Sequence, residues 1–210
     1  MPATPSTKKG RRTRASILEA AGRVFSKDGY VDARMSDIAT EAGLSTGGLY
    51  RYFDNKTDVF AALIADLHEE FYDASGHTGG VLASEPLKAL QEANRGYIEL
   101  YHQNRHVMRA FIEAAAVERR FRLILREMRE RHVRRFARTY KDLFDSSSIR
   151  GVPVTTMADA LACMVEQCCY VWFAQDEEFN VSMSIDDAVV ATSQAWFATI
   201  FEGQAQRDLS

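Results

Sequence analysis

The chain has 210 residues, of which 46% are hydrophobic, and its formal net charge is −3. This composition supports a substantial buried core and excludes a disordered or collagen-like chain. No run reaches the roughly 18 apolar residues of a membrane span. The basic N-terminus also lacks the apolar segment of a signal peptide, so we expect a cytoplasmic protein that does not contact a membrane.

Helical periodicity dominates the chain and predicts about nine helices. Apolar residues line one face of the first helix, which ends at Gly29, where we expect a left-handed backbone conformation. The glycine- and serine-rich segment 74–84 and the segment 145–154 are predicted loops. No segment is a convincing strand, so the predicted fold class is all-α. After the first helix, the others are expected at about 35–42, 46–53, 56–73, 86–102, 105–116, 118–144, 155–174 and 184–203.

The two short helices within residues 35–53 have the proportions of a helix-turn-helix. Ser45 is a predicted N-cap of the second of them, yet two glycines follow in its first turn. Each glycine inside a helix costs up to about 1 kcal/mol relative to alanine. A recognition helix enters the major groove of DNA with its N-terminal residues nearest the bases. Gly47 and Gly48 would therefore let the backbone approach DNA closely, and the alternative is that they allow tight packing within the protein.

The outer face of this helix and the start of the next one carry polar and basic groups. Thr46, Tyr50, Arg51 and Tyr52 offer hydrogen-bond donors and aromatic rings that suit a groove. Lys56 lies in the first turn of the next helix, where a cation opposes the helix macrodipole. A bound DNA phosphate would turn that small penalty into a favourable contact.

The segment "MSDIATEAGLSTGGLYRYFDNKTDVF" resembles the DNA-binding signature of the TetR family of transcriptional regulators. The resemblance extends back to about Arg14, whereas the residues from about 61 onward match the family only in length and helix count. The residues that carry it are Ile38, Ala39, Ala42, Gly43, Leu44, Ser45, Gly47, Leu49, Tyr50, Tyr52, Phe53 and Lys56.

This resemblance implies a DNA-binding role for particular residues. Thr46, Gly47 and Tyr50 would reach base edges or the adjacent backbone, and Tyr52 and Lys56 would contact phosphates. Two positions depart from the family pattern: Gly48 lacks the usual small hydroxyl, and Arg34 replaces the usual Thr or Ser helix cap. The full candidate set is Arg34, Ser36, Ser45, Thr46, Gly47, Gly48, Tyr50, Arg51, Tyr52 and Lys56.

The resemblance also implies a domain organisation. Residues 1–13 would form a basic disordered arm, 14–60 the helix-turn-helix domain, and 61–210 a domain that binds an effector and forms a homodimer. Apolar residues on several faces of the last two helices are compatible with dimerisation, although a monomer core is the alternative. The candidate dimer stripe comprises Val189, Val190, Trp196, Phe197, Ile200 and Phe201.

The effector pocket is predicted on aromatic and methionine stripes, with His132 the one ionisable group on the seventh helix's stripe. Such a lining favours a mainly apolar or aromatic effector. The alternative is that these stripes are ordinary core. The candidates are Tyr97, Tyr101, Met108, Phe111, Phe121, Leu125, Met128, His132, Met164, Cys168 and Trp172.

The resulting hypothesis is a dimeric, ligand-responsive regulator, a repressor, that binds a palindromic operator in double-stranded DNA. We expect no enzymatic activity, no cofactor and no metal. One alternative is an all-α enzyme or metal-dependent hydrolase that uses some of the five histidines, although no nucleophile elbow, phosphate loop or metal-ligand cluster supports it. The other alternative is a DNA-binding protein without an effector.

Overall fold

The computed structural model describes residues 7–76, 79–175 and 182–201. In this part of the chain it contains ten α-helices, which confirms the all-α prediction. The chain divides into two compact units. One unit comprises Met1–Glu69 and His106–Arg122, and the other comprises Glu70–Arg105 and Leu123–Ser210.

The first unit is built on a cluster of buried aromatic rings. Phe121 lies at its centre, with its ring centroid 5.1 Å from that of Tyr30, 5.3 Å from Phe60 and 6.2 Å from Phe111. These residues are at most 2% exposed, so the unit has a dense core. The helices that contribute residues to the unit are α1 (Lys8–Asp32), α2 (Met35–Glu41), α3 (Thr46–Tyr50), α4 (Lys56–Ala74), α7 (Arg105–Val117) and α8 (Arg119–Phe144).

Helix α1 begins earlier than the sequence predicts. The side chain of Thr7 accepts a hydrogen bond from the backbone amide of Gly10 at 3.1 Å, so Thr7 is the N-cap. Lysine and arginine are good helix formers, and this cap starts the helix at Lys8. The prediction of a disordered arm is therefore wrong for residues 8–13, and residues 1–6 lie outside the described residues.

Gly29 has φ +71° and ψ −176°, so it has the expected positive φ but not the conformation of a left-handed helix cap, and it interrupts α1 before its last three residues. The polar groups of these last residues contact α4 and α7, as described below. The residues after the interruption therefore link α1 to α4 and α7 within the first unit.

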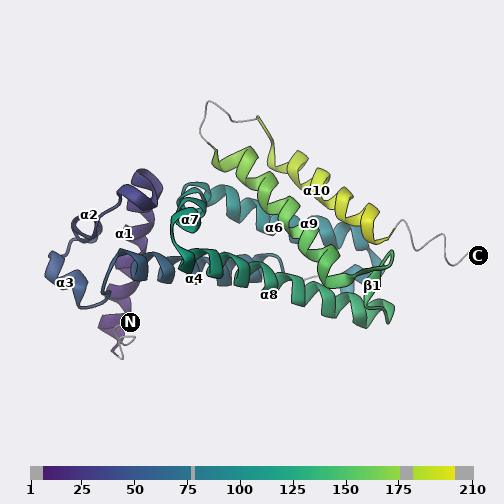
Figure 1. Ribbon diagram of the computed structural model, residues 1–210, viewed down its shortest axis with the longest axis horizontal. Helices are drawn as coiled ribbons and strands as arrows, with labels where there is room; N and C mark the ends of the chain where they lie inside the picture. Colours follow the sequence, from purple (N-terminus) through teal and green to yellow (C-terminus); the bar gives the residue numbers. More distant parts are fainter. Residues whose placement is uncertain (1–6, 77–78, 176–181, 202–210) are drawn as a thin grey trace, which may run out of the picture. The chain divides into compact units, whose positions relative to one another are not determined.

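The second unit holds the rest of the helices and a short hairpin. Figure 1 shows α10 running beside α6 and α9, which it contacts. A helix forms within the predicted loop 74–84, and a two-residue strand pair forms within the predicted loop 145–154. The elements are α5 (Gly79–Ser84), α6 (Pro86–Gln103), the strands β1 (Ser148–Ile149) and β2 (Val152–Pro153), α9 (Val154–Cys169), a π-helical turn (Tyr170–Ala174) and α10 (Ile185–Ile200).

Within the described ranges, no helix combines the length and the apolar character that a membrane span requires.

Candidate nucleic-acid interface and ligand cavity

The turn between α2 and α3 has the geometry of a helix-turn-helix. Gly43 adopts φ +67°, and the amide of Leu44 donates to the carbonyl of Ala39 at 2.9 Å. Ile38 and Leu49 are fully buried, so the inner faces of α2 and α3 pack within the first unit. These contacts leave the outer face of α3 uncovered.

Helix α3 is shorter than predicted, since it ends at Tyr50 and gives way to a turn. The Ser45 hydroxyl accepts a hydrogen bond from the amide of Gly48 at 3.1 Å, which confirms the predicted cap. One of the amides at the helix start is therefore already paired. The side chains of Thr46, Tyr50 and Arg51 are exposed, and Tyr50 is 49% exposed although it is a large aromatic residue.

The two glycines of α3 have different surroundings. A Cβ atom on Gly48 would lie 3.2 Å from the Ser45 hydroxyl, whereas a Cβ atom on Gly47 would meet no atom within 4 Å. Among the described residues, no packing contact within the chain therefore requires glycine at position 47. An open position on the exposed face of α3 instead fits close approach by another molecule.

The two candidate residues at the start of α2 are both exposed. Arg34 is the N-cap residue of α2, and its side chain makes no capping hydrogen bond. The Ser36 hydroxyl donates to the Asp37 carboxylate at 3.1 Å. Tyr52 is half-buried on the C-terminal side of α3.

Lys56 has an internal role that the sequence did not reveal. Its ammonium group donates to the carbonyl oxygens of Tyr30 at 2.7 Å and Val31 at 2.8 Å. It also lies 4.8 Å from the centre of the Tyr30 ring. Burial lowers the pKa of Lys56. Two of the three ammonium N–H groups are thus used within the protein, and one is left for a phosphate.

The end of α1 is held on its other side by two glutamates. Glu113 accepts hydrogen bonds from the amides of Tyr30 at 2.8 Å and Val31 at 3.2 Å. The Tyr30 hydroxyl donates to Glu118 and lies 2.9 Å from the Thr57 hydroxyl. Burial, and then the bond to Glu118, raises the pKa of Tyr30 to about 12. The group formed by Tyr30, Val31, Lys56, Glu113 and Glu118 is called the Tyr30 junction below.

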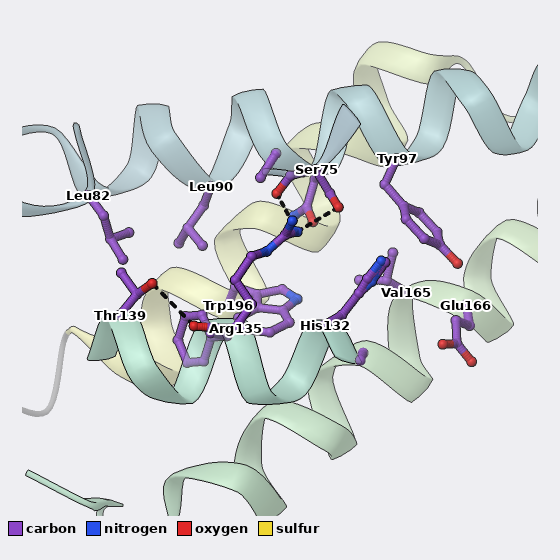
Figure 2. A pocket seen from close by; sticks show the side chains of 14 residues that line it. Ser75, Leu82, Leu90, Tyr97, His132, Arg135, Thr139, Val165, Glu166 and Trp196 are labelled. Atoms are coloured by element: carbon purple, nitrogen blue, oxygen red, sulfur yellow. Dashed lines mark hydrogen bonds between the residues drawn. The ribbon is translucent and has the colours of Figure 1, made fainter. Parts of the chain in front are cut away.

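The second unit contains a cavity of about 120 Å³ between α6, α8 and α9 (Figure 2). Its wall is mainly apolar, with polar groups at a few points. A wall of this kind is typical of small-molecule sites. The apolar wall includes Leu82, Leu90, Ala93, Phe136, Ala162 and Val165.

The polar groups of the cavity differ in how they are paired. Glu166 forms an ion pair with Arg129 at 2.6 Å, and burial raises the pKa of Glu166. Arg135 donates to the carbonyls of Tyr72 and Ser75, the latter at 2.8 Å, as Figure 2 shows for Ser75. The buried indole Nε1 of Trp196 has no hydrogen-bond partner among the described residues.

The predicted pocket residues fall into three groups. Tyr97 and His132 line this cavity. Met108, Phe111 and Phe121 are instead buried in the first unit, where Phe111 and Phe121 belong to the aromatic cluster, and this corrects their assignment. The others do not line this cavity: Tyr101 is buried, and Leu125, Met128, Met164, Cys168 and Trp172 are half-buried.

The predicted dimer stripe on α10 is largely used within the second unit. Val189 and Ile200 are buried, and Trp196 lines the cavity. Phe197 and Phe201 stack on each other at 5.3 Å and are half-buried. Val190 is 48% exposed.

The capped turn, the buried inner face and the exposed α3 define a helix-turn-helix protein. The family description "Bacterial regulatory proteins, tetR family" matches residues 17–63. The regulator TtgR of Pseudomonas putida is 44% identical over 59 residues, which are 28% of each chain. The chain thus spans just over a quarter of the length of the first curated relatives that it matches. An uncharacterised regulator of Bacillus subtilis, YfiR, is 29% identical over 70% of this chain and 73% of its own.

Solved structures extend the likeness to nearly the whole chain. A transcriptional regulator from Rhodococcus sp. RHA1 has a TM-score of 0.72 at 18% identity, covering 90% of this chain and 96% of its own. A TetR-family protein from Mesorhizobium loti also has a TM-score of 0.72, at 20% identity, over 92% and 98% of the two chains. At these identities the likeness shows the fold alone. Residues 17–63 thus match the DNA-binding segment of the TetR family, and the chain as a whole has a TetR-like fold.

Proposed function

We propose that this protein is a ligand-responsive repressor that binds a palindromic operator as a homodimer and is released by a small, mainly apolar molecule. The observation that carries the proposal is the exposed face of α3, where Gly47 leaves open space beside Thr46 and Tyr50. Each protomer would place α3 in the major groove of one half-site.

Two further observations support the remaining parts of the proposal. The cavity in the second unit is a candidate effector site of mainly apolar character. Exposed Val190 and half-buried Phe197 on α10 are candidates for a surface that a second copy would cover. Effector binding would act on operator binding with a coupling of about 1–3 kcal/mol, which changes affinity roughly 5- to 150-fold.

The first experiment is selection of bound fragments from a random DNA library at two salt concentrations. We expect a palindromic consensus and binding that weakens steeply as salt rises, because phosphate contacts release counterions. Sedimentation analysis of the free protein tests the dimer. Protein that has been unfolded and refolded to remove bound small molecules, and that still enriches no sequence, would contradict the proposal.

Gly47→Ala separates stability from DNA binding. Because a Cβ atom at this position meets nothing within the chain, alanine should raise the free energy of unfolding by about 0.4–1 kcal/mol. The same methyl group should lower operator affinity about tenfold if the α3 backbone approaches DNA. Urea unfolding and fluorescence anisotropy measure the two effects.

Gly22→Ala is the matched control, since a Cβ atom there is in ordinary contact with Leu63 in the middle of α1. This variant should gain similar stability and keep wild-type operator affinity. Unchanged operator affinity in Gly47→Ala would show that α3 does not approach DNA at this point.

Lys56→Ala should weaken binding to all DNA sequences and reduce the salt slope by about 1, whereas Tyr50→Ala should alter sequence preference. Lys56 also holds the end of α1, so Glu113→Gln serves as the comparison that loosens the same junction without removing a cation. If Glu113→Gln reduced the salt slope as much as Lys56→Ala, the role of Lys56 would be structural and not a phosphate contact.

A further inference from the structure

The size of the cavity limits what it can hold. A dry apolar cavity of about 150 Å³ accommodates a benzene molecule. The cavity in the second unit measures about 120 Å³ and has a mainly apolar wall. Its occupant is therefore comparable in size to one aromatic ring or a short alkyl chain that carries a small polar group.

The charges around the cavity do not balance. Arg129 binds both carboxylate oxygens of Glu166, through Nε to Oε1 at 3.2 Å and through Nη2 to Oε2 at 2.6 Å, so the two charges neutralise each other. Arg135 is half-buried, and among the described residues its hydrogen bonds go to carbonyl and hydroxyl oxygens of Tyr72 and Ser75 and to no carboxylate. Burial lowers the pKa of Arg135 and outweighs the influence of the exposed Asp73 carboxylate. The guanidinium group of Arg135 also lies 4.1 Å from the centre of the Tyr72 ring. Among the described residues, the cavity wall thus holds a cation that is hydrogen-bonded to no carboxylate.

Trp196 supplies a second signal that is independent of charge. Indole Nε1 is a donor and cannot accept, and a buried donor normally has a partner. Nε1 of Trp196 is buried at the cavity and has no hydrogen-bond partner among the described residues. An oxygen atom brought by a ligand would satisfy it. Figure 2 shows Trp196 and Arg135 among the side chains that line the cavity.

We infer that the cavity binds a small organic monocarboxylate, with an aromatic ring or short alkyl chain against the apolar wall and its carboxylate on Arg135 and Trp196. Arginine suits this role because its guanidinium group binds carboxylates through charge-assisted hydrogen bonds. This names the chemical class of the effector and so rests on the proposed function for its regulatory meaning.

The same contacts imply how the ligand acts. Arg135 binds the carbonyls at the C-terminal end of α4, the helix whose first residue is Lys56 of the Tyr30 junction. A carboxylate that takes the guanidinium group competes with these carbonyls. Binding therefore loosens the hold on the end of α4.

Isothermal titration of the full chain, without DNA, tests the ligand class. The probes are benzoate and phenylacetate, each compared with its uncharged counterpart, benzyl alcohol and 2-phenylethanol. We expect at least one carboxylate to bind about tenfold or more tightly than its alcohol, with quenching of tryptophan fluorescence. Binding of the alcohols at equal affinity, or of none of the four probes at millimolar concentrations, would overturn the inference.

Two variants locate the site. Arg135→Met should remove the preference for the carboxylate, and Trp196→Phe, which keeps an aromatic ring, should weaken carboxylate binding several-fold. Arg138→Met is the control, because Arg138 is exposed on the same helix and does not line this cavity. If Arg135→Met fails to fold, Trp196→Phe and the acid–alcohol pairs still decide the question. A carboxylate preference that survives Arg135→Met would place the anion elsewhere.

The failures of the two proposals are distinguishable. Carboxylate binding without any operator would contradict the regulator and leave the ligand class standing. An operator whose binding is unaffected by bound carboxylate would remove the ligand's regulatory role alone.

Discussion

The two compact units differ in how particular polar groups are paired. In the first, the Tyr30 hydroxyl bonds to Glu118, and the nearly buried Asp58 pairs with Arg120 at 2.6 Å. In the second, Trp196 Nε1 has no acceptor among the described residues, and Arg135 relies on carbonyls beside an open cavity. Complete pairing fixes geometry, whereas incomplete pairing leaves chemistry for a ligand to supply. Tyr30 and Asp58 are therefore held in place by partners within the first unit, whereas Trp196 leaves a hydrogen-bond donor for a ligand in the second.

The largest expected effect comes from adding one methyl group to the densely packed unit. Gly29→Ala places a Cβ atom 2.7 Å from a Glu113 carboxylate oxygen at φ +71°. Strain of about 1–3 kcal/mol for an alanine at this positive φ with ψ −176° adds to about 1 kcal/mol for the displaced Glu113 hydrogen bonds. We therefore expect the free energy of unfolding to fall by about 2–4 kcal/mol in urea titrations.

Gly43→Ala separates the two parts of this effect. Gly43 has φ +67°, but a Cβ atom there meets nothing within 4 Å. It should cost only the strain of about 1–2 kcal/mol. Equal losses in the two variants would mean that the Glu113 contact adds no stability, and the contrast between the units would weaken.

A smaller effect, with a distinctive pH dependence, is expected for Tyr30→Phe. Loss of the buried hydroxyl should cost about 1 kcal/mol at pH 8. The pKa of Tyr30 is about 12 in the folded protein, above the value of about 10 in an unfolded chain. The stability that the protonated hydroxyl provides is therefore fully present below pH 10 and is lost as the pH rises towards 12.

Urea unfolding of both proteins at pH 8 and pH 11 measures this difference. The gap between the wild type and Tyr30→Phe should narrow at pH 11. Tyr50→Phe is the control, because it removes the hydroxyl of an exposed tyrosine in the same unit. A gap of constant size at both pH values would show that the hydroxyl does not titrate with folding.

Local features were predictable from the sequence because their partners lie a few residues away. The Ser45 hydroxyl accepts from the amide of Gly48, as predicted, and Asn55 accepts from the amide of Asp58 at 2.8 Å over the same short spacing. The positive φ of Gly29 followed from the same short-range pattern. The all-α fold follows from many such local signals.

Features that depend on distant residues were not predictable. Lys56 contacts carbonyls 25 and 26 residues away, and no local pattern distinguishes this from a solvated or phosphate-bound lysine. Periodicity placed Trp196 and Phe121 on apolar stripes, but a stripe does not reveal whether it faces a dimer, a cavity or a core. The structure places Trp196 at the cavity and Phe121 in the aromatic cluster.

The smallest expected effect on stability is for the same kind of insertion in the second unit. Ala93 lines the cavity, so Ala93→Leu should fill open space and change the free energy of unfolding by no more than about 0.5 kcal/mol. Ala114 on α7 is fully buried in the first unit, and Ala114→Leu should cost about 1–3 kcal/mol through overpacking. Urea unfolding of the two variants compares the units directly.

The two insertions should also differ in what else they change. Ala93→Leu should lower the affinity for a bound carboxylate about tenfold, because the added carbons occupy the space of the ligand. A loss of stability at Ala93 equal to that at Ala114 would mean that the second unit closes around its cavity in solution. The cavity would then not be a preformed site, and a ligand would first have to open it.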